Sequence, residues 1–76
     1  MSAAPAILDE ETIRWISVKD ALPDADATVM VFAPGADEPV WLGWYEGEGV
    51  WHSVDAAPYD PDTVTAWATL PMGPKR

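Results

Sequence analysis

The sequence predicts a mostly β domain, with α+β as the alternative: a small antiparallel sheet or barrel-like meander of four or five short strands and one short helical turn. Short runs rich in β-branched and aromatic residues recur along the chain, and segments rich in proline, glycine and aspartate separate them. The spacing of these runs, about 10–14 residues, is typical of consecutive strands joined by turns. The strongest single signal is an aromatic hairpin sequence that holds three of the five tryptophans.

The aromatic hairpin runs from Val40 to Val54 and reads VWLGWYEGEGVWHSV. Two apolar runs joined by a Gly-containing turn, at residues 46–49 here, are the signature of a β-hairpin. Alternation along the first strand groups Val40, Leu42 and Trp44 on one face and Trp41, Gly43 and Tyr45 on the other. Because both faces are apolar, we expect one of them to be partly exposed. At Gly43 we expect a ring from a neighbouring strand to lie over the missing side chain.

The chain divides into an arm and one domain. Residues 1–14 form an N-terminal arm that begins with an Ala/Pro-rich stretch, and residues 15–74 form a single β-rich domain with no internal repeat or linker. The acidic residues 9–11 suit the start of a short helix, although little room remains for one before Trp15.

The first strand is expected over residues 14–18, which are β-branched and aromatic. Ser17, with an acidic residue three positions later, has the form of a capping box and predicts one helical turn over residues 18–21. A proline ends that turn, because it disfavours helical geometry at the residue before it. We expect that residue, Leu22, to point inward beneath Trp15.

Two further strands are expected, over Thr28 to Phe32 and over Val64 to Leu70. The first of these is apolar at four consecutive positions, which predicts a central strand covered on both faces. Residues 24–27, 33–39 and 55–62 are expected to form the connecting turns and loops, because proline, glycine, alanine and acidic residues dominate them.

The five tryptophans divide into core candidates and surface candidates. We expect Trp15, Trp51 and Trp67 to lie in the core. Trp41 or Trp44 is instead expected on a partner-facing patch, because aromatic side chains are enriched at protein interfaces and both hairpin faces are apolar.

The charge balance limits the classes of partner. Thirteen acidic residues face four basic ones, giving a formal net charge of −9, and only Lys75 and Arg76 are adjacent basic residues. Direct binding to nucleic acids or anionic membranes is therefore not expected, since phosphate contacts need clustered Lys and Arg. The chain has no cysteine, no signal-peptide pattern and no stretch near the ~20 apolar residues of a membrane span. We expect a soluble intracellular protein whose negative charge serves either solubility alone or attraction to basic surfaces.

Residues suited to catalysis or metal binding are sparse. His52 is the only histidine, and without cysteine it has no partner for a zinc site. We expect it to be a half-exposed strand residue. Asp60 and Asp62 could bind calcium weakly, but the EF-hand pattern is absent. The turn at 47–49 is acidic, which would repel phosphate. We therefore expect no enzyme activity, no metal and no cofactor.

Several sequence pieces resemble a small family of unknown function that recurs in bacteriophage and prophage genomes. These pieces are Trp15-Ile16-Ser17-Val18, Leu22-Pro23, Val29 to Phe32, Gly43-Trp44-Tyr45, Trp51, Val64-Thr65, Trp67 and Leu70-Pro71. The chain departs from the family pattern at Ala66, where relatives usually carry His, and at Ala68-Thr69, where they carry Met-Pro. The resemblance implies a phage or prophage origin and supplies no catalytic residues.

Together these observations predict a non-enzymatic phage-type protein that binds a host protein with a basic surface in the bacterial cytoplasm. Its most specific form is an inhibitor of a nucleic-acid-binding defence complex, similar to anti-CRISPR proteins that cover a nucleic-acid-binding surface of a CRISPR effector. The expected contact residues are loop acids and two hairpin tryptophans: Asp24, Asp26, Asp37, Glu38, Trp41, Trp44, Glu46, Glu48, Asp60 and Asp62. The alternative is a structural or self-assembling accessory protein, whose apolar hairpin face would make a homo-oligomer.

Overall fold

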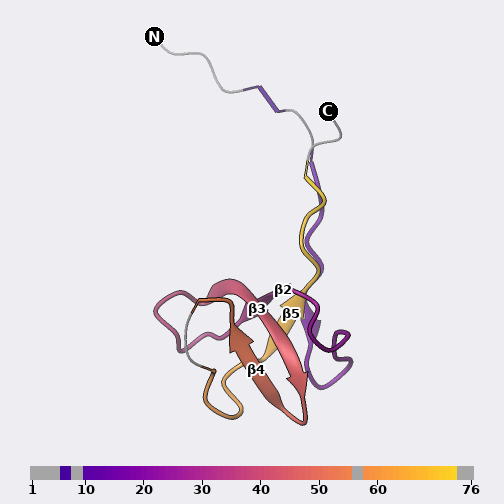
Figure 1. The fold of residues 1–76 in the computed structure, drawn as a ribbon. Helices are drawn as coiled ribbons and strands as arrows, with labels where there is room; N and C mark the ends of the chain where they lie inside the picture. The colour runs from indigo at the N-terminus through magenta and orange to yellow at the C-terminus, as the bar shows by residue number, and fades with distance from the viewer. Residues whose placement is uncertain (1–5, 8–9, 56–57, 74–76) are drawn as a thin grey trace.

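A computed structural model describes residues 6–7, 10–55 and 58–73. It contains one antiparallel sheet with the strand order β1-β5-β2-β3-β4. The strands are β1 (Ile16–Ser17), β2 (Val29–Phe32), β3 (Val40–Gly47), β4 (Val50–Ser53) and β5 (Ala66–Ala68). The described residues include no helix. The predicted β architecture is confirmed, and the sheet is open rather than barrel-like, since β1 and β4 form its two edges (Figure 1).

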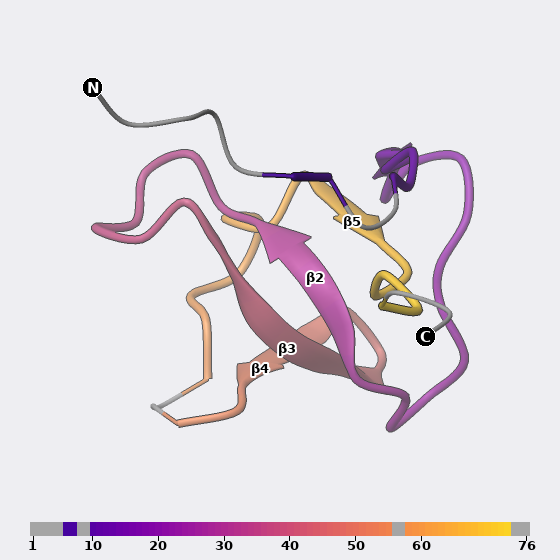
Figure 2. The same cartoon turned by 90° about the horizontal axis from the view of Figure 1, so that it is seen from above.

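The chain order explains why β2 lies at the centre of the sheet. β2, β3 and β4 follow one another as a meander, and β5 then returns to pair with the free side of β2 (Figure 2). Pairing extends beyond the short strands, because the Thr65 N–H donates to the Phe32 carbonyl at 3.0 Å and the Val18 N–H to the Thr65 carbonyl at 3.1 Å. The first, second and last strands are therefore shorter than expected, although their positions are correct.

The core lies on one face of the sheet. Val31 is fully buried at the centre of β2, and Trp67 of β5 is opposite Val31 on one side and Ile16 on the other. Trp51 and Tyr45 pack their rings together with centroids 4.9 Å apart. The expectation that Trp51 and Trp67 are core residues is confirmed, and both are at least 93% buried.

Trp67 also connects the sheet to the segment after β1. Its indole N–H donates to the Ala21 carbonyl at 2.9 Å. In that segment, the Asp20 and Ala21 N–H groups donate to the Ser17 carbonyl, and the Ser17 hydroxyl accepts from the Lys19 N–H. The expected helical turn is thus a single hydrogen-bonded turn and not a helix.

Two core predictions were wrong. Trp15 is 43% exposed and Leu22 is 48% exposed, so neither covers the other in the core. The reason is the alternation of strand side chains: because Ile16 packs against the core, Trp15 points to the opposite face. There the Trp15 and Phe32 rings lie with their centroids 6.0 Å apart. β2 is likewise buried only at Val29 and Val31, and its other face is half-buried.

The hairpin between β3 and β4 turns at Glu48 and Gly49, both with positive φ, as in the type I′ turn of two-residue hairpins. The pairing shifts between Tyr45 and Gly47, which leaves Glu46 as an extra, bulged residue. Burial of the Tyr45 ring places its hydroxyl oxygen where it accepts a hydrogen bond from the Gly49 N–H at 2.9 Å. The turn is thus tied to the core.

Gly43 has a different neighbour from the one expected. A Cβ atom there would overlap the His52 carbonyl oxygen and lie 3.3 Å from a Val31 methyl group, with no aromatic ring among its nearest neighbours. The missing side chain therefore allows close backbone approach between β3 and β4.

The two ends of the described chain run side by side away from the sheet (Figure 1). The Glu11 carboxylate accepts hydrogen bonds from the Met72 and Gly73 N–H groups, at 2.7 and 2.8 Å. Residues 10–11 are not helical, and residue 9 lies outside the described residues. The expected division into an arm, 1–14, and a domain, 15–74, also involves residues that are not described, and it stays a prediction.

Candidate partner-binding surface

The face of the sheet opposite the core carries a row of apolar side chains that remain accessible. Val40, Leu42 and Trp44 alternate along β3 on this face, and Val54 joins them because its N–H donates to the Leu42 carbonyl. Val40, Leu42 and Val54 are 45%, 38% and 48% exposed, and Trp44 is half-buried. We call these four residues the outer patch. Over β5 the same face is covered, since Ala68 is fully buried.

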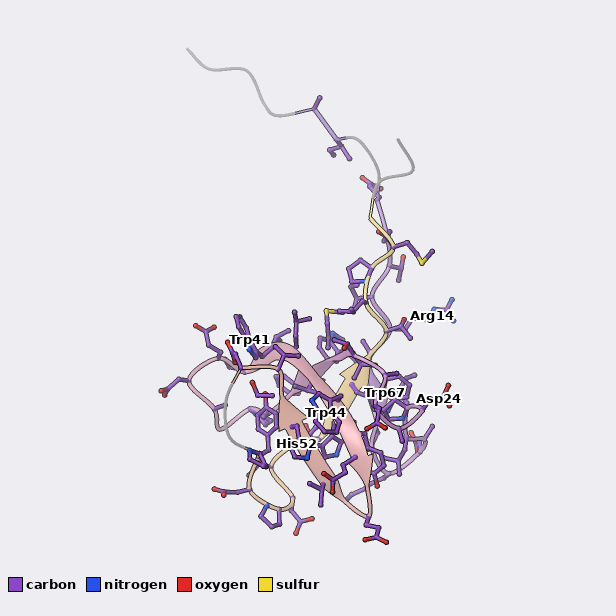
Figure 3. All side chains as sticks on the ribbon, in the orientation of Figure 1. Arg14, Asp24, Trp41, Trp44, His52 and Trp67 are labelled. Atoms are coloured by element: carbon purple, nitrogen blue, oxygen red, sulfur yellow. The ribbon has the colours of Figure 1, made fainter. Side chains whose placement is uncertain are left out.

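Trp44 is held in place by its neighbours on the hairpin. Its ring stacks on the His52 ring with centroids 4.1 Å apart and planes 9° from parallel (Figure 3). His52 Nε2 lies 2.9 Å from a carboxylate oxygen of Glu46, the bulged residue. The His52 side chain is 19% exposed, so it is more buried than the half-exposed strand residue that was expected. Glu46, His52 and Trp44 therefore form one ordered unit, which fixes the tryptophan of the outer patch.

A shallow pocket of about 320 Å³ borders this unit. Asp26, Thr28, Trp44 and Val54 line it. The Asp26 N–H donates to the Tyr45 carbonyl at 2.9 Å, which fixes the loop before β2 against the end of β3. One of the predicted acids and one of the predicted tryptophans thus meet at the same pocket.

The predicted acids are all exposed, and most occupy loops or turns as expected. These are Asp24, Asp26, Asp37, Glu38, Glu48, Asp60 and Asp62. Glu46 is the exception, because it belongs to β3 and not to the turn. It is also the only one of the eight whose carboxylate is bonded within the described residues, through His52. The other seven carboxylates are exposed and form no bond to another residue that the structure describes.

A second surface lies around Tyr59, between the loop that follows β2 and the loop that follows β4. Two adjoining cavities of about 530 and 430 Å³ share Tyr59, Ala36 and Pro58 in their walls. The predicted residues that line them are Glu38, Trp41, Asp60 and Asp62. Trp41, 38% exposed, donates its indole N–H to the Asp55 carboxylate at 3.0 Å. The ten predicted contact residues therefore do not form one site.

Comparison with protein families supplies the classification of this chain. The family described as "Protein of unknown function (DUF551)" matches residues 14–75. The chain belongs to this family. Comparison with curated proteins and with solved structures gives no significant match. The motif-based resemblance is thereby confirmed at the level of the family.

The described part of this DUF551 domain offers little for metal chemistry. No three His, Cys, Asp or Glu residues within it converge on a position where they could hold a metal ion. Asp60 and Asp62 line a cavity together, but they gain no third ligand there among the described residues. No helix in the same ranges is long and apolar enough to cross a membrane.

Several residues of the DUF551 domain's surface were not among those predicted. Leu42, Val40 and Val54 complete the outer patch, and His52 orders Trp44. The alternation of β3 already placed Val40 and Leu42 on the face of Trp44, so that signal was available in the sequence. Asp55 was not predictable, because only the fold brings it to the Trp41 indole.

Proposed function

We propose that this DUF551 domain is a non-enzymatic binding protein that docks its outer patch against a protein with a basic surface. The observation that carries the proposal is the outer patch itself: three exposed aliphatic side chains share one sheet face with an ordered tryptophan on an acidic molecule. Exposed apolar side chains grouped on one face are characteristic of interaction sites. Aromatic residues in such patches often provide a large share of the binding energy.

Charge favours a different protein over a second copy of this chain as the occupant. A symmetric dimer through the outer patch would bring the same surface of each copy together. It would oppose Asp26 and the other acids of one copy to those of the other, and each copy carries a formal charge of −9. A partner with Lys and Arg around an apolar centre would instead gain from the same charges, both in encounter rate and in specificity.

The most specific form of the proposal is inhibition of a nucleic-acid-binding defence complex of a bacterial host, such as a CRISPR effector. Proteins that bind nucleic acids have basic surfaces of the required sign. Seven exposed carboxylates without partners in the described residues support competition for such a surface. The phage-type resemblance of the sequence motifs supports a host protein as the target.

The proposal is tested by capture followed by competition. Tagged protein is incubated with a bacterial lysate at low and high salt, and retained proteins are identified by mass spectrometry. We expect a retained nucleic-acid-binding protein at low salt that is lost at high salt, since salt screens attraction between exposed charges. The purified partner is then bound to labelled nucleic acid, and the domain should displace the label.

A matched pair of variants connects the result to the outer patch. Leu42→Asn changes an exposed patch residue, whereas Leu70→Asn changes an exposed leucine outside it. We expect only Leu42→Asn to weaken displacement, by about tenfold or more, the loss expected of an interface anchor. Equal effects of the two variants, or capture of the same chain alone with a stable oligomer at micromolar concentration, would instead support the self-assembling alternative.

A further inference from the structure

We infer that the shallow pocket between Asp26 and Trp44 is a subsite for one arginine side chain of the partner. The guanidinium group would stack on the free face of the Trp44 indole and pair with the Asp26 carboxylate. This inference rests on the proposed function, and it adds the chemistry of the side chain that the domain recognises.

The stacking of Trp44 determines which indole face is free. The His52 ring of β4 covers one face of the Trp44 ring, with the ring centroids 4.1 Å apart and the two planes nearly parallel. A further stacking group can therefore use only the opposite face of the indole. Together with Trp44, the pocket is lined by Asp26, by Thr28, which directly precedes β2, and by Val54, which directly follows β4. A planar cationic group entering the pocket would meet an aromatic ring that is already held in position.

Asp26 supplies the second half of the subsite. Its carboxylate forms no hydrogen bond or ion pair with any other residue that the structure describes. Glu46 and Asp55, by contrast, are bonded to His52 and Trp41. Asp26 has φ of 68°, a left-handed conformation that aspartate and asparagine tolerate, and its N–H is bonded to Tyr45. The backbone therefore fixes Asp26, whose carboxylate has no partner among the described residues, in the wall of the pocket.

The geometry favours arginine over lysine. A guanidinium is planar and presents paired N–H groups, so it can stack on an indole and donate two hydrogen bonds to one carboxylate at the same time. A lysine ammonium is a compact, strongly hydrated charge that cannot do both with the same geometry. The subsite would thus select for arginine among the basic residues of a partner surface.

The test uses the full chain labelled with ¹⁵N and three blocked tripeptides that differ only at the central residue. The peptides are acetyl-Gly-Arg-Gly-amide, its lysine analogue and its citrulline analogue, which keeps the planar group and lacks the charge. The readout is the movement of the Trp44 indole N–H signal during titration, with the Trp41 indole N–H signal as an internal reference. We expect a saturable shift of the Trp44 signal with the arginine peptide, and binding at least about threefold weaker with the other two.

Two variants provide matched controls. Asp26→Asn removes the charge and keeps a residue that tolerates positive φ. Asp24→Asn removes the same charge from an exposed position that does not line the pocket. We expect Asp26→Asn to weaken arginine binding by about five- to tenfold and Asp24→Asn by less than about twofold. The dispersion of the amide spectrum shows that each variant is folded.

The outcomes separate this inference from the proposed function. Equal binding of arginine and lysine, equal losses in the two variants, or no movement of the Trp44 signal would overturn the arginine subsite. In each of those cases, salt-sensitive capture and competition could still succeed, and the proposed function would stand without the subsite. Failure of capture and competition, with the tripeptide result intact, would instead overturn the proposed function alone.

Discussion

At Gly43, the contact between β3 and β4 depends on the absence of a single carbon atom. The backbone carbonyl of His52 occupies the space that a Cβ atom would need, and a backbone group of a paired strand cannot move away as the end of a side chain can. We predicted that an aromatic ring would lie over Gly43. The sequence shows that a side chain is missing there, but it does not show which group occupies the space.

Gly43→Ala should therefore weaken the pairing of the hairpin. We expect the free energy of unfolding to fall by about 2 kcal/mol or more, as when an atom is forced into a filled site. Urea denaturation followed by tryptophan fluorescence measures the change. The control is Gly35→Ala, where the added carbon has no neighbour within 4 Å and should change stability by less than about 0.5 kcal/mol. Equal effects of the two substitutions would contradict the packing of β3 on β4.

Tyr59 provides a prediction for alkaline pH. Burial raises the pKa of its phenol above the ordinary 10.0, and the negative charge of Asp55 raises it further. A raised pKa in the folded state means that the unfolded chain loses this proton first as the pH rises. The stabilising contribution is therefore complete below pH 10 and is lost as the pH passes through the folded-state pKa.

Substitutions at Tyr59 and Asp55 check this pH dependence. Absorbance titration of the phenols should show one group ionising late, and Tyr59→Phe should remove it together with part of the alkaline loss of stability. Asp55→Asn should lower the pKa of that late phenol, because it removes the second cause of the shift. A late phenol that persists in Tyr59→Phe would show that another tyrosine is responsible.

The tryptophans show how far residue-level prediction reaches. Trp51 and Trp67 were predicted correctly, because the motif pieces that carry the family resemblance centre on them. Trp15 was not, since it immediately precedes a two-residue strand in which alternation gives no signal. Only the packing of Ile16 against the core decides that Trp15 faces outward.

At the scale of elements, the hairpin was predictable and its turn only in part. The sequence located the turn within residues 46–49, and the structure narrows it to Glu48 and Gly49 with a bulge at Glu46. A bulge inserts one residue into a strand and changes which side chains face outward after it. Because the sequence does not reveal the bulge, Glu46 was expected in a loop. It instead lies in β3, and its carboxylate bonds to His52.

Glu48 adopts φ of 55°, which costs free energy for a residue other than glycine, asparagine or aspartate. Glu48→Asn creates the Asn-Gly sequence that type I′ turns favour. We expect it to raise the free energy of unfolding by about 0.5–1 kcal/mol. Glu38→Asn is the matched control, because Glu38 is also an exposed acid but has no positive φ. An equal gain in the free energy of unfolding in both variants would indicate that reduced charge repulsion, and not the turn conformation, causes the stabilisation.

At the scale of the whole molecule, the strand order was beyond the reach of sequence patterns. A meander follows from short loops, but the return of β5 between β1 and β2 depends on contacts between segments far apart in the chain. On the outer face, the sheet is covered over β5, at Ala68, and exposed over β3 and β4, at the outer patch. The predicted surface residues were consequently divided between the outer patch side and the Tyr59 side of the molecule.

The single sheet explains why a binding function is proposed for this fold. One face of the sheet holds the core and the other retains exposed apolar side chains, so a partner could bury them without rearranging the domain. In the proposal, the negative charge of the molecule sets the sign of the partner's surface, and the arginine subsite selects one of its side chains. These two statements have separate tests.

The central claim is that the outer patch occupies a basic surface of another protein. The most direct measurement is displacement of labelled nucleic acid from the captured partner, titrated with the wild-type domain, Leu42→Asn and Leu70→Asn at several salt concentrations. We predict displacement by wild type and Leu70→Asn that weakens with increasing salt, and displacement by Leu42→Asn that is about tenfold weaker at each salt concentration. Displacement that changes neither with salt concentration nor with the Leu42→Asn substitution would contradict the claim.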